Sequence, residues 1–259
     1  MKKLTAALLA LLMLLTAAAA MADSGLETIQ SKGTLVIATE GNWSPWTYHD
    51  GNGVLTGFDI EIGTLIAERL GVKPEFKEVP WESILAGVDT GTFDIACNGV
   101  GYTEERAQKF LFSDPYVYTE AVLVVRKDNQ DIQSLDDLKG RTTSNSPNST
   151  YAMKAEDMGA TVVYVDTLGE TMMMVEDGRV EATINAKSSV DDYLREHPNA
   201  RIKVVQTFAG EPVCYPIRKT DENADLLAKI NEILAELRND GTLAKLSVKY
   251  FGEDLTGEQ

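Results

Sequence analysis

Short apolar runs alternate along the chain with segments whose apolar residues recur at helical spacing. Residues 35–38 predict a buried strand, and residues 58–70, with Ile62 and Ile66 on one face, predict a helix that ends at Gly71. Further strands are expected at 75–79, 93–96, 121–125, 142–144, 162–165, 182–184 and 202–205, and further helices at 81–88, 134–138, 151–158, 168–176, 190–196, 224–237 and 243–250. This alternation predicts an α/β fold with mostly parallel sheets.

Two strand-like segments next to acid–proline pairs, 120–125 and 213–218, are candidates for crossings between two lobes. Paired crossings would place residues 23–119 and 217–259 in one lobe and residues 120–216 in the other. The final helices would then return to the first lobe. Loops at the strand ends of both sheets would face a shared cleft, which is where α/β sheets usually bind ligands.

Residues 1–22 have the pattern of a secretory signal peptide. A basic start precedes a run of Leu and Ala, and Ala20-Met21-Ala22 supplies small residues for cleavage. The alternative is a membrane anchor, because the apolar run is nearly long enough to span a bilayer. We expect cleavage, and therefore an exported and soluble mature chain.

Charge and composition exclude several classes of partner. The chain carries 40 Asp and Glu against 24 Lys and Arg. Binding to nucleic acid or an anionic membrane is not expected, because phosphate contacts need clustered cations. Cys97 and Cys214 could form one disulfide or remain buried thiols. The two histidines, His49 and His197, lack metal-ligand spacing, so neither a metal nor a cofactor is expected.

The segment CNGVGYTEER contains a candidate anion site. Gly99 and Gly101 allow backbone N–H groups to approach a ligand closely. Thr103 is a good helix N-cap, and Arg106 would lie in the first turn, where a cation opposes the helix dipole. A carboxylate suits this pattern better than a phosphate, because no full phosphate-loop motif is present. The alternative is a surface ion pair between Arg106 and a neighbouring acid.

Aromatic residues follow predicted strands on the same side as this loop. Trp43 and Trp81 are candidates to hold a ligand's side chain by stacking or cation–π contact, whereas Trp46 is expected to pack in the core. Glu40 could bind an ammonium or hydroxyl group, or be a solvated loop acid. In the second lobe, Ser149 or Thr150 could cap a helix and offer N–H groups to an anion.

Seven segments together resemble one known family. They are GTLVIATEGNWSPWTYHD, LTGFDIEIGTLIAERLGV, WESILAGVDTGTFDIACNGVGYTEER, FSDPYV, SLDDLKG, GRVEATIN and LRNDGTLAKLSVKYFG, and they span nearly all of the chain after residue 30. The chain resembles periplasmic polar amino-acid-binding proteins of ABC importers, family 3 of the bacterial extracellular solute-binding proteins. Glu40-Gly41 and Asn98 are most similar to the cystine-binding group.

The resemblance implies a type II periplasmic binding protein fold, in which two lobes joined by two hinge strands close over a small amino acid or related carboxylate. It also implies a monomer that docks on an ABC permease in the inner membrane. Arg106 would clamp the ligand's α-carboxylate, with backbone N–H groups of Gly101 and Thr150 assisting. The backbone at Asn98 and Gly99 would meet the α-amino group.

The resemblance further implies that Trp43 and Trp81 flank the ligand's side chain, and that Glu40 contacts its polar end. Residues 148–150 take the place of the family's Gly-Thr-Thr or Gly-Thr-Asn. Asn148 in place of glycine is tolerable if its backbone is left-handed, a conformation that Asn adopts more readily than most residues.

One departure concerns the ligand's ammonium group. Ala186 stands where the family usually carries an amine-pairing Asp, and a desolvated ammonium without an anion is costly. Three interpretations stay open. Glu40, Asn185 or Glu211 could replace the Asp; the ligand could lack a free α-amino group, with Lys187 contacting a second carboxylate; or amino acids could bind weakly.

No residues combine a nucleophile with its base, so no catalytic residue and no enzymatic activity are expected. Two other classes compete with a binding protein. Cyclohexadienyl dehydratases resemble these binders and would need an acid poised in the cleft, for which Glu40 is the candidate. A stand-alone sensor domain for signalling is the other class.

Overall fold

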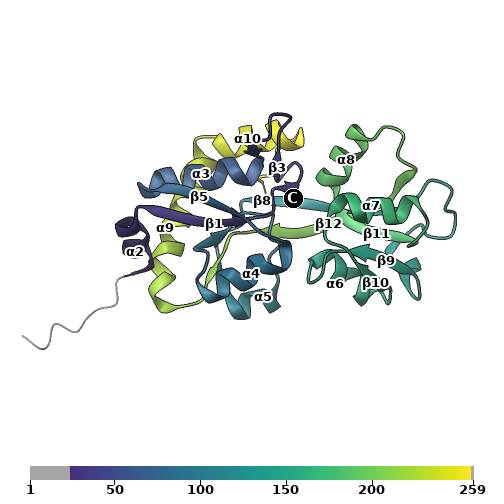
Figure 1. Cartoon of the computed structure of the whole chain (residues 1–259), viewed down its shortest axis with the longest axis horizontal. Coiled ribbons are helices and arrows are strands. Elements are labelled where there is room, and N and C mark those ends of the chain that lie inside the picture. Colours follow the sequence, from purple (N-terminus) through teal and green to yellow (C-terminus); the bar gives the residue numbers. More distant parts are fainter. Residues whose placement is uncertain (1–23, 258–259) are drawn as a thin grey trace, which may run out of the picture.

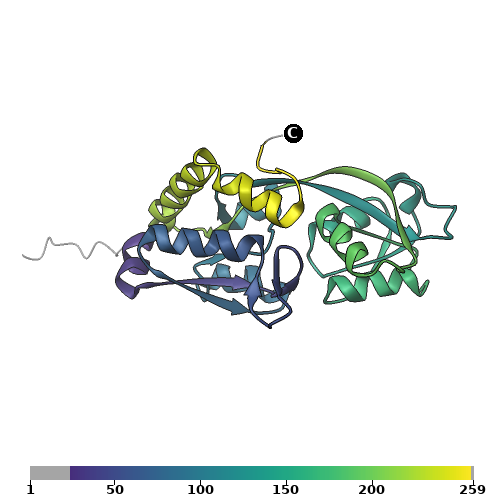
Figure 2. The ribbon, with the colours of Figure 1, turned by 90° about the horizontal axis from the view of Figure 1, so that it is seen from above.

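The computed structural model describes residues 24–257, so the predicted signal peptide at 1–22 lies outside the described residues. Two α/β lobes lie side by side, and two long strands, β8 (Val117–Arg126) and β12 (Ile202–Val213), run between them (Figures 1 and 2). None of the helices in the described range is both long and apolar enough to cross a membrane.

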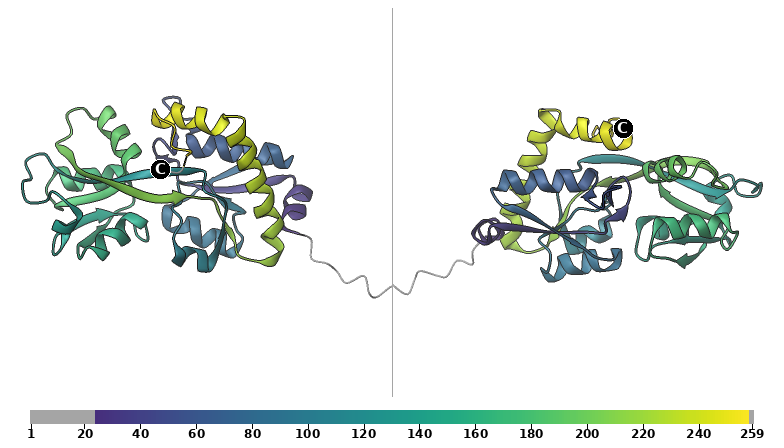
Figure 3. Two further views of the ribbon diagram at one scale, coloured as in Figure 1. Left: turned by 180° about the vertical axis from the view of Figure 1, so that it is seen from behind. Right: turned by 45° about the horizontal axis from the view of Figure 1, so that its top comes forward.

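The first lobe is built on a five-stranded sheet with the order β5-β1-β6-β13-β7. β1 pairs in parallel with β5 and β6, whereas β13 pairs antiparallel with β6 and β7. The last two helices, α9 and α10, return to this lobe, as expected (Figure 3). The elements are β1 (Thr34–Thr39), β5 (Lys73–Glu78), β6 (Ile95–Ala96), β7 (Phe110–Phe112), β13 (Pro216–Arg218), α2 (Gly25–Lys32), α3 (Phe58–Leu70), α4 (Trp81–Thr90), α5 (Glu104–Lys109), α9 (Ala224–Asn239), α10 (Thr242–Phe251) and the 3-10 helix η2 (Asp221–Asn223).

The second lobe repeats this plan with the strand order β10-β9-β11-β8-β12. β9 pairs in parallel with β10 and β11, and β8 pairs antiparallel with β11 and β12. The remaining elements are β9 (Thr142–Asn145), β10 (Thr161–Tyr164), β11 (Ala182–Ala186), α6 (Thr150–Asp157), α7 (Leu168–Glu176), α8 (Lys187–Glu196) and the 3-10 helix η1 (Leu135–Leu138).

The expectation of mostly parallel sheets is wrong, because each large sheet is mixed. The antiparallel pairs are those of β13 with β6 and β7 in the first lobe, and those of β8 with β11 and β12 in the second. β8 carries the chain into the second lobe and β12 carries it back, so the two strands must run in opposite directions (Figure 2).

We propose that the first lobe boundary lies near residue 120, within β8. The second crossing expected at 213–218 is displaced, because the crossing strand β12 ends at Val213 and Pro216–Arg218 form β13 of the first lobe's sheet. Residue 216 therefore belongs to the first lobe.

The helices begin and end as their sequences dictate. The apolar face of α3 buries Ile62, Ile66 and Leu70, and the helix stops at Gly71, whose φ of 77° is left-handed. In α7, Thr167 and Glu170 form a reciprocal capping box that satisfies N-terminal backbone donors. These local signals explain why the observed bounds of both helices equal the predicted ones.

A three-stranded sheet of β2 (Asn42–Trp43), β3 (Thr47–His49) and β4 (Leu55–Thr56) was not predicted from the sequence. Its strands are too short to show a period of two. β2 and β3 pair through Trp43 and Thr47, which folds the segment back on itself. The sheet thereby fixes the tryptophans of this segment beside the first lobe's core.

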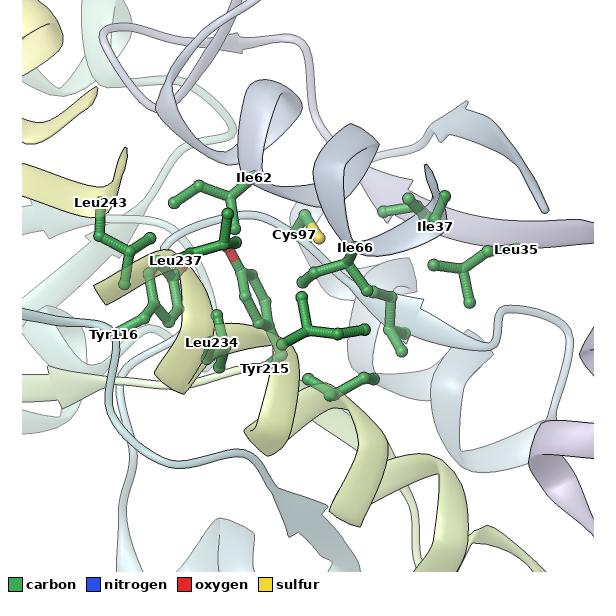
Figure 4. Close-up of a cluster of buried hydrophobic side chains, with 14 of the residues drawn as sticks. Leu35, Ile37, Ile62, Ile66, Cys97, Tyr116, Tyr215, Leu234, Leu237 and Leu243 are labelled. Carbon is green, nitrogen blue, oxygen red and sulfur yellow. The ribbon is translucent and has the colours of Figure 1, made fainter. Parts of the chain in front are cut away.

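The core of the first lobe gathers side chains from both ends of the chain. Leu35, Ile66 and Leu237 belong to one buried cluster that also contains Cys97 (Figure 4). Cys97 and Cys214 are both buried free thiols, so they do not form the disulfide that the sequence left open.

Candidate ligand-binding site

A cavity opens between the lobes and encloses about 750 Å³ of atom-free space, including its mouth. Its walls come from the loops after β1, β6, β9 and β10, together with the start of α4, the end of β11 and part of β12. All ten residues expected at the site line it: Glu40, Trp43, Trp81, Asn98, Gly99, Gly101, Arg106, Ser149, Thr150 and Asn185. The structure therefore brings together side chains that lie up to 145 positions apart.

Arg106 makes a direct hydrogen bond between the two lobes. Thr103 caps α5, as predicted, by accepting the Arg106 backbone N–H at 3.1 Å. The guanidinium donates from Nη1 to the Gly101 carbonyl at 2.8 Å and from Nη2 to the Asn148 carbonyl at 2.9 Å. It also lies 5.5 Å from the centre of the Trp81 ring. The side chain thus connects the first lobe to the second.

The surface ion pair considered for Arg106 is not formed. Arg106 is only 8% exposed, and within residues 24–257 no carboxylate lies within ion-pair distance of its guanidinium. Burial lowers the pKa of Arg106, and the negative charge of Glu211 partly opposes this shift. Two of its five N–H groups bind carbonyls, so three remain for an incoming carboxylate.

The backbone of the loop before α5 is bound to the interior of the first lobe. This corrects the expectation that the Gly99 N–H approaches a ligand. The Gly99 N–H donates to Asp59 Oδ2 at 2.5 Å, so it faces the lobe interior and is not free for a ligand. Gly99 has a φ of 57°, and a Cβ there would lie 2.6 Å from the Trp43 ring. The residue must be glycine because of backbone conformation and close aromatic packing.

Asn98 joins this loop to the loop after β1. Its Oδ1 accepts hydrogen bonds from the hydroxyls of Thr39 and Thr47 and from the Glu40 backbone N–H at 2.9 Å. Its Nδ2 donates to Glu40 Oε2 at 2.7 Å. The Asn98 side chain therefore orients Glu40, a role that the sequence did not reveal.

Glu40 is not a solvated loop acid. Burial raises its pKa to about 7, and the hydrogen bond from Asn98 offsets only part of that shift. The carboxyl group therefore titrates near neutral pH. A cation in the cavity would favour its ionised form.

The tryptophans divide as expected. Trp46 is 1% exposed and packs in the core, which confirms that prediction, although one edge of it also reaches the cavity. Trp43 stacks on it with ring centres 5.5 Å apart and an angle of 15° between the planes. Trp43 and Trp81 are both half-buried and present aromatic surface to the cavity.

The second lobe offers the N-terminus of α6. Ser149 is its N-cap and accepts the Ala152 N–H at 3.1 Å, and Thr150 begins the helix. Asn148 has a φ of 57°, which confirms the left-handed backbone expected for an Asn in place of glycine. The first N–H groups of a helix have no partner within it, so this end favours an anion close to Arg106.

Position 186 itself supplies no carboxylate, because it is an alanine. Ala186 is fully buried at the end of β11, and its N–H is bound by Asn185 Oδ1 at 2.9 Å. The side-chain oxygen of Asn185 therefore already accepts one hydrogen bond from the backbone. Lys187 pairs with Asp191 at 3.0 Å and Glu253 at 3.7 Å and does not line the cavity. The interpretation that gave Lys187 a ligand carboxylate is therefore wrong.

Asp166 is a charged residue of the cavity that was not expected from the sequence. It lies two residues after β10, just beyond the end of a parallel strand, and this position could have revealed it. Together with Glu40 and Glu211, it gives the described lining three carboxyl groups against one guanidinium. Within the described part of the chain, no His, Cys, Asp and Glu residues cluster as a metal site.

Comparison with known proteins decides the family. Residues 35–253 match the family described as bacterial extracellular solute-binding proteins, family 3. The chain belongs to this family. A probable amino-acid ABC transporter-binding protein of Haemophilus influenzae is 37% identical to this family 3 protein over 231 residues, covering 89% of each chain.

Two similar solved structures differ in whether a ligand is bound. An ancestral arginine-binding protein bound to arginine is 38% identical, with a TM-score of 0.79 over 85% of this chain and 99% of that one. The unliganded, open L-cystine solute receptor of Neisseria gonorrhoeae is 40% identical, with a TM-score of 0.60 over 91% of this chain and 100% of that one. The chain as a whole therefore superposes better on the arginine-bound structure than on the open one. The chain is the solute-binding component of an amino-acid ABC transporter, similar to cystine-binding proteins.

Proposed function

We propose that this protein captures, in the periplasm, an amino acid that carries a second cationic group. Closure of the lobes would seat the ligand, and docking on an inner-membrane permease would release it. One observation supports this most strongly: Arg106 lies next to the N-terminus of α6, in a cavity whose other charged lining groups are three carboxyls. Closure around a bound solute is a common hinge motion.

The carboxylate half of the site would be formed by Arg106 and the start of α6. The guanidinium has free N–H groups in a fixed plane, which suits two-point binding of a carboxylate. The backbone N–H of Thr150 and the helix dipole add to the same positive region. Because Arg106 is buried, its interaction with an anion is weakened less by water than at the surface.

The ammonium half would be formed by Glu211, which replaces the absent Asp at position 186. Glu211 lines the same cavity as Arg106 and is near enough for its negative charge to act on the guanidinium, although the two do not form an ion pair. Glu211 Cβ also lies 3.2 Å from the position that a Cβ on Gly101 would take. We therefore assign the α-ammonium to Glu211 rather than to Asn185, because a neutral amide cannot supply the negative charge that pairs with an ammonium.

The far end of the ligand would meet Glu40 and Asp166 between the aromatic walls of Trp43 and Trp81. Two carboxyl groups and exposed aromatic faces favour a cation there. L-Arginine and L-cystine both carry a second cationic group away from the α-carbon, in one case a guanidinium and in the other a second ammonium accompanied by its own carboxylate. An acidic side chain would add unpaired negative charge to a partly buried cavity, which is costly.

Calorimetric titration with L-arginine, L-cystine, L-glutamine and L-glutamate tests this assignment. We expect binding of a ligand with a second cation, weaker binding of L-glutamine, and no binding of L-glutamate. For the tightest ligand, the analogue with hydrogen in place of the α-amino group should bind at least tenfold more weakly, because Glu211 loses its partner. Equal affinity for that analogue, or preference for L-glutamate, would contradict the proposal.

A second candidate function, a dehydratase-like activity, is favoured only by Glu40, whose raised pKa of about 7 suits a general acid in the cavity. Incubation with prephenate and with arogenate tests it. Consumption that disappears in Glu40→Gln would establish catalysis. Unchanged substrate over many hours would leave ligand capture as the function.

A further inference from the structure

A fully buried carboxylate lies directly beneath the cavity loop. Asp59, the second residue of α3, has no exposed surface. Its Oδ2 accepts the Gly99 N–H at 2.5 Å, and its Oδ1 accepts the hydroxyls of Tyr116 at 2.6 Å and Tyr215 at 3.1 Å. One side chain thereby joins three segments that lie far apart in the sequence.

The two tyrosines stand where the chain passes between the lobes. Tyr116 immediately precedes β8, and Tyr215 follows the end of β12 by two residues. Their rings are stacked, with centres 4.2 Å apart and planes 12° from parallel, inside the core cluster of the first lobe (Figure 4). The Tyr116 N–H also donates to the Val213 carbonyl at 3.1 Å. The pair therefore ties the start of β8 to the end of β12.

The energetic setting explains why the carboxylate matters. Burial raises the pKa of Asp59 to about 6, while its three hydrogen bonds favour the ionised form. A position in the first turn of α3 adds the favourable helix dipole. Removal of the acceptor would leave buried donors without partners, which costs more than the bond itself contributes.

We infer that Asp59 is a positioning residue that couples the two crossing strands to the cavity loop. The inference rests on the proposed capture by lobe closure. Movement at the crossings shifts Tyr116 and Tyr215, and the rigid carboxylate transmits that shift to the Gly99 backbone. Gly99 in turn sets the loop that leads to Gly101 and Arg106.

Such coupling is reciprocal by thermodynamic linkage. A ligand that fixes the loop therefore also favours the closed arrangement of the crossing strands. None of the three side chains, Asp59, Tyr116 and Tyr215, lines the cavity. Any effect of their substitution on affinity must therefore act through the loop or the hinge rather than through ligand contact.

Tyr116→Phe and Tyr215→Phe test the inference, since each removes one hydroxyl and keeps the ring stack. Tyr193→Phe is the matched control, because its hydroxyl bonds to Glu176 within the second lobe. The ligand is the tightest of the four amino acids above. Affinity is measured by calorimetry at a temperature where every variant is folded, and ligand-induced compaction is measured by small-angle X-ray scattering.

We expect each hinge variant to lose affinity by about tenfold, with smaller compaction on ligand addition, and the control to retain both. Asp59→Asn, if it folds, should make the two tyrosine substitutions nearly silent, because an amide has one oxygen in place of two and cannot accept the Gly99 N–H and the tyrosine hydroxyls in this geometry, so the link between the loop and the tyrosines is already broken. A lowered melting temperature with unchanged affinity and compaction would overturn the inference and leave a structural role. Binding by the wild type without compaction would overturn the closure proposal as well, which separates the two failures.

Discussion

The guanidinium of Arg106, in the first lobe, donates to the backbone carbonyl of Asn148 in the second lobe at 2.9 Å. The left-handed backbone of Asn148, with a φ of 57°, places that carbonyl at the start of α6. The cation that we assign to the ligand's carboxylate therefore also holds the lobes together. Ligand capture and lobe contact meet at one side chain.

The backbone of Asn148 yields a first prediction. Asn148→Ala should destabilise the protein by about 1 kcal/mol, because alanine tolerates the left-handed region poorly, whereas Asn148→Gly should be neutral or slightly stabilising in the native conformation. Ligand affinity should fall only in the alanine variant. Urea unfolding and calorimetry measure both quantities. Equal stability of the two variants would contradict the role given to this backbone conformation.

Glu40 yields a prediction about pH. Its folded pKa of about 7 lies above the ordinary value of 4.5, so the folded protein binds more protons than the unfolded chain between these values. Stability should therefore fall as pH rises from about 4.5 to about 7. Affinity for a cationic ligand should rise over the upper part of that window, because ionised Glu40 attracts it.

Glu40→Gln is the control for both effects. It should flatten the rise in affinity near pH 7 and remove part of the stability slope. The rest of the slope should remain, because burial also raises the pKa of Asp59, to about 6. Affinity that is independent of pH between 5 and 8 in the wild type would argue against contact between Glu40 and the ligand.

The two cysteines yield a third prediction. Burial raises the pKa of Cys97 well above its usual value and that of Cys214 to about 12, so neither forms a reactive thiolate at neutral pH. Both should resist a thiol reagent in the native state and react fully after unfolding in guanidinium. A reducing agent should leave the melting temperature unchanged. Absence of titratable thiols in the unfolded chain would reveal a disulfide instead.

Local signals in the sequence predicted much of the fold, and together with the family resemblance they predicted the main residues of the cavity. The spacing of Ile62 and Ile66 and the stop at Gly71 define α3 without reference to any other segment. The strands β2 to β4 escaped prediction because two or three residues show no period. The mixed strand directions depend on where the chain crosses between the lobes, which no local pattern encodes.

Long-range contacts account for what the sequence did not reveal in the site. Whether the Gly99 N–H faces a ligand depends on Asp59, forty positions earlier. Whether Glu40 is solvated depends on Asn98, and whether Lys187 reaches the cavity depends on Glu253. Each answer requires the relative placement of segments that only the tertiary structure provides.

Calorimetry on Arg106→Ala tests the central claim most directly. The variant should keep its fold, as judged by circular dichroism and cooperative unfolding, because the lost hydrogen bonds go to carbonyls beside a solvent-open cavity. Binding of the tightest amino acid should weaken by at least a hundredfold, since a buried two-point contact with the carboxylate is removed. Arg106→Lys should recover only part of the loss, because a single ammonium cannot reproduce the planar fork. Affinity of the folded alanine variant equal to that of the wild type would contradict the account.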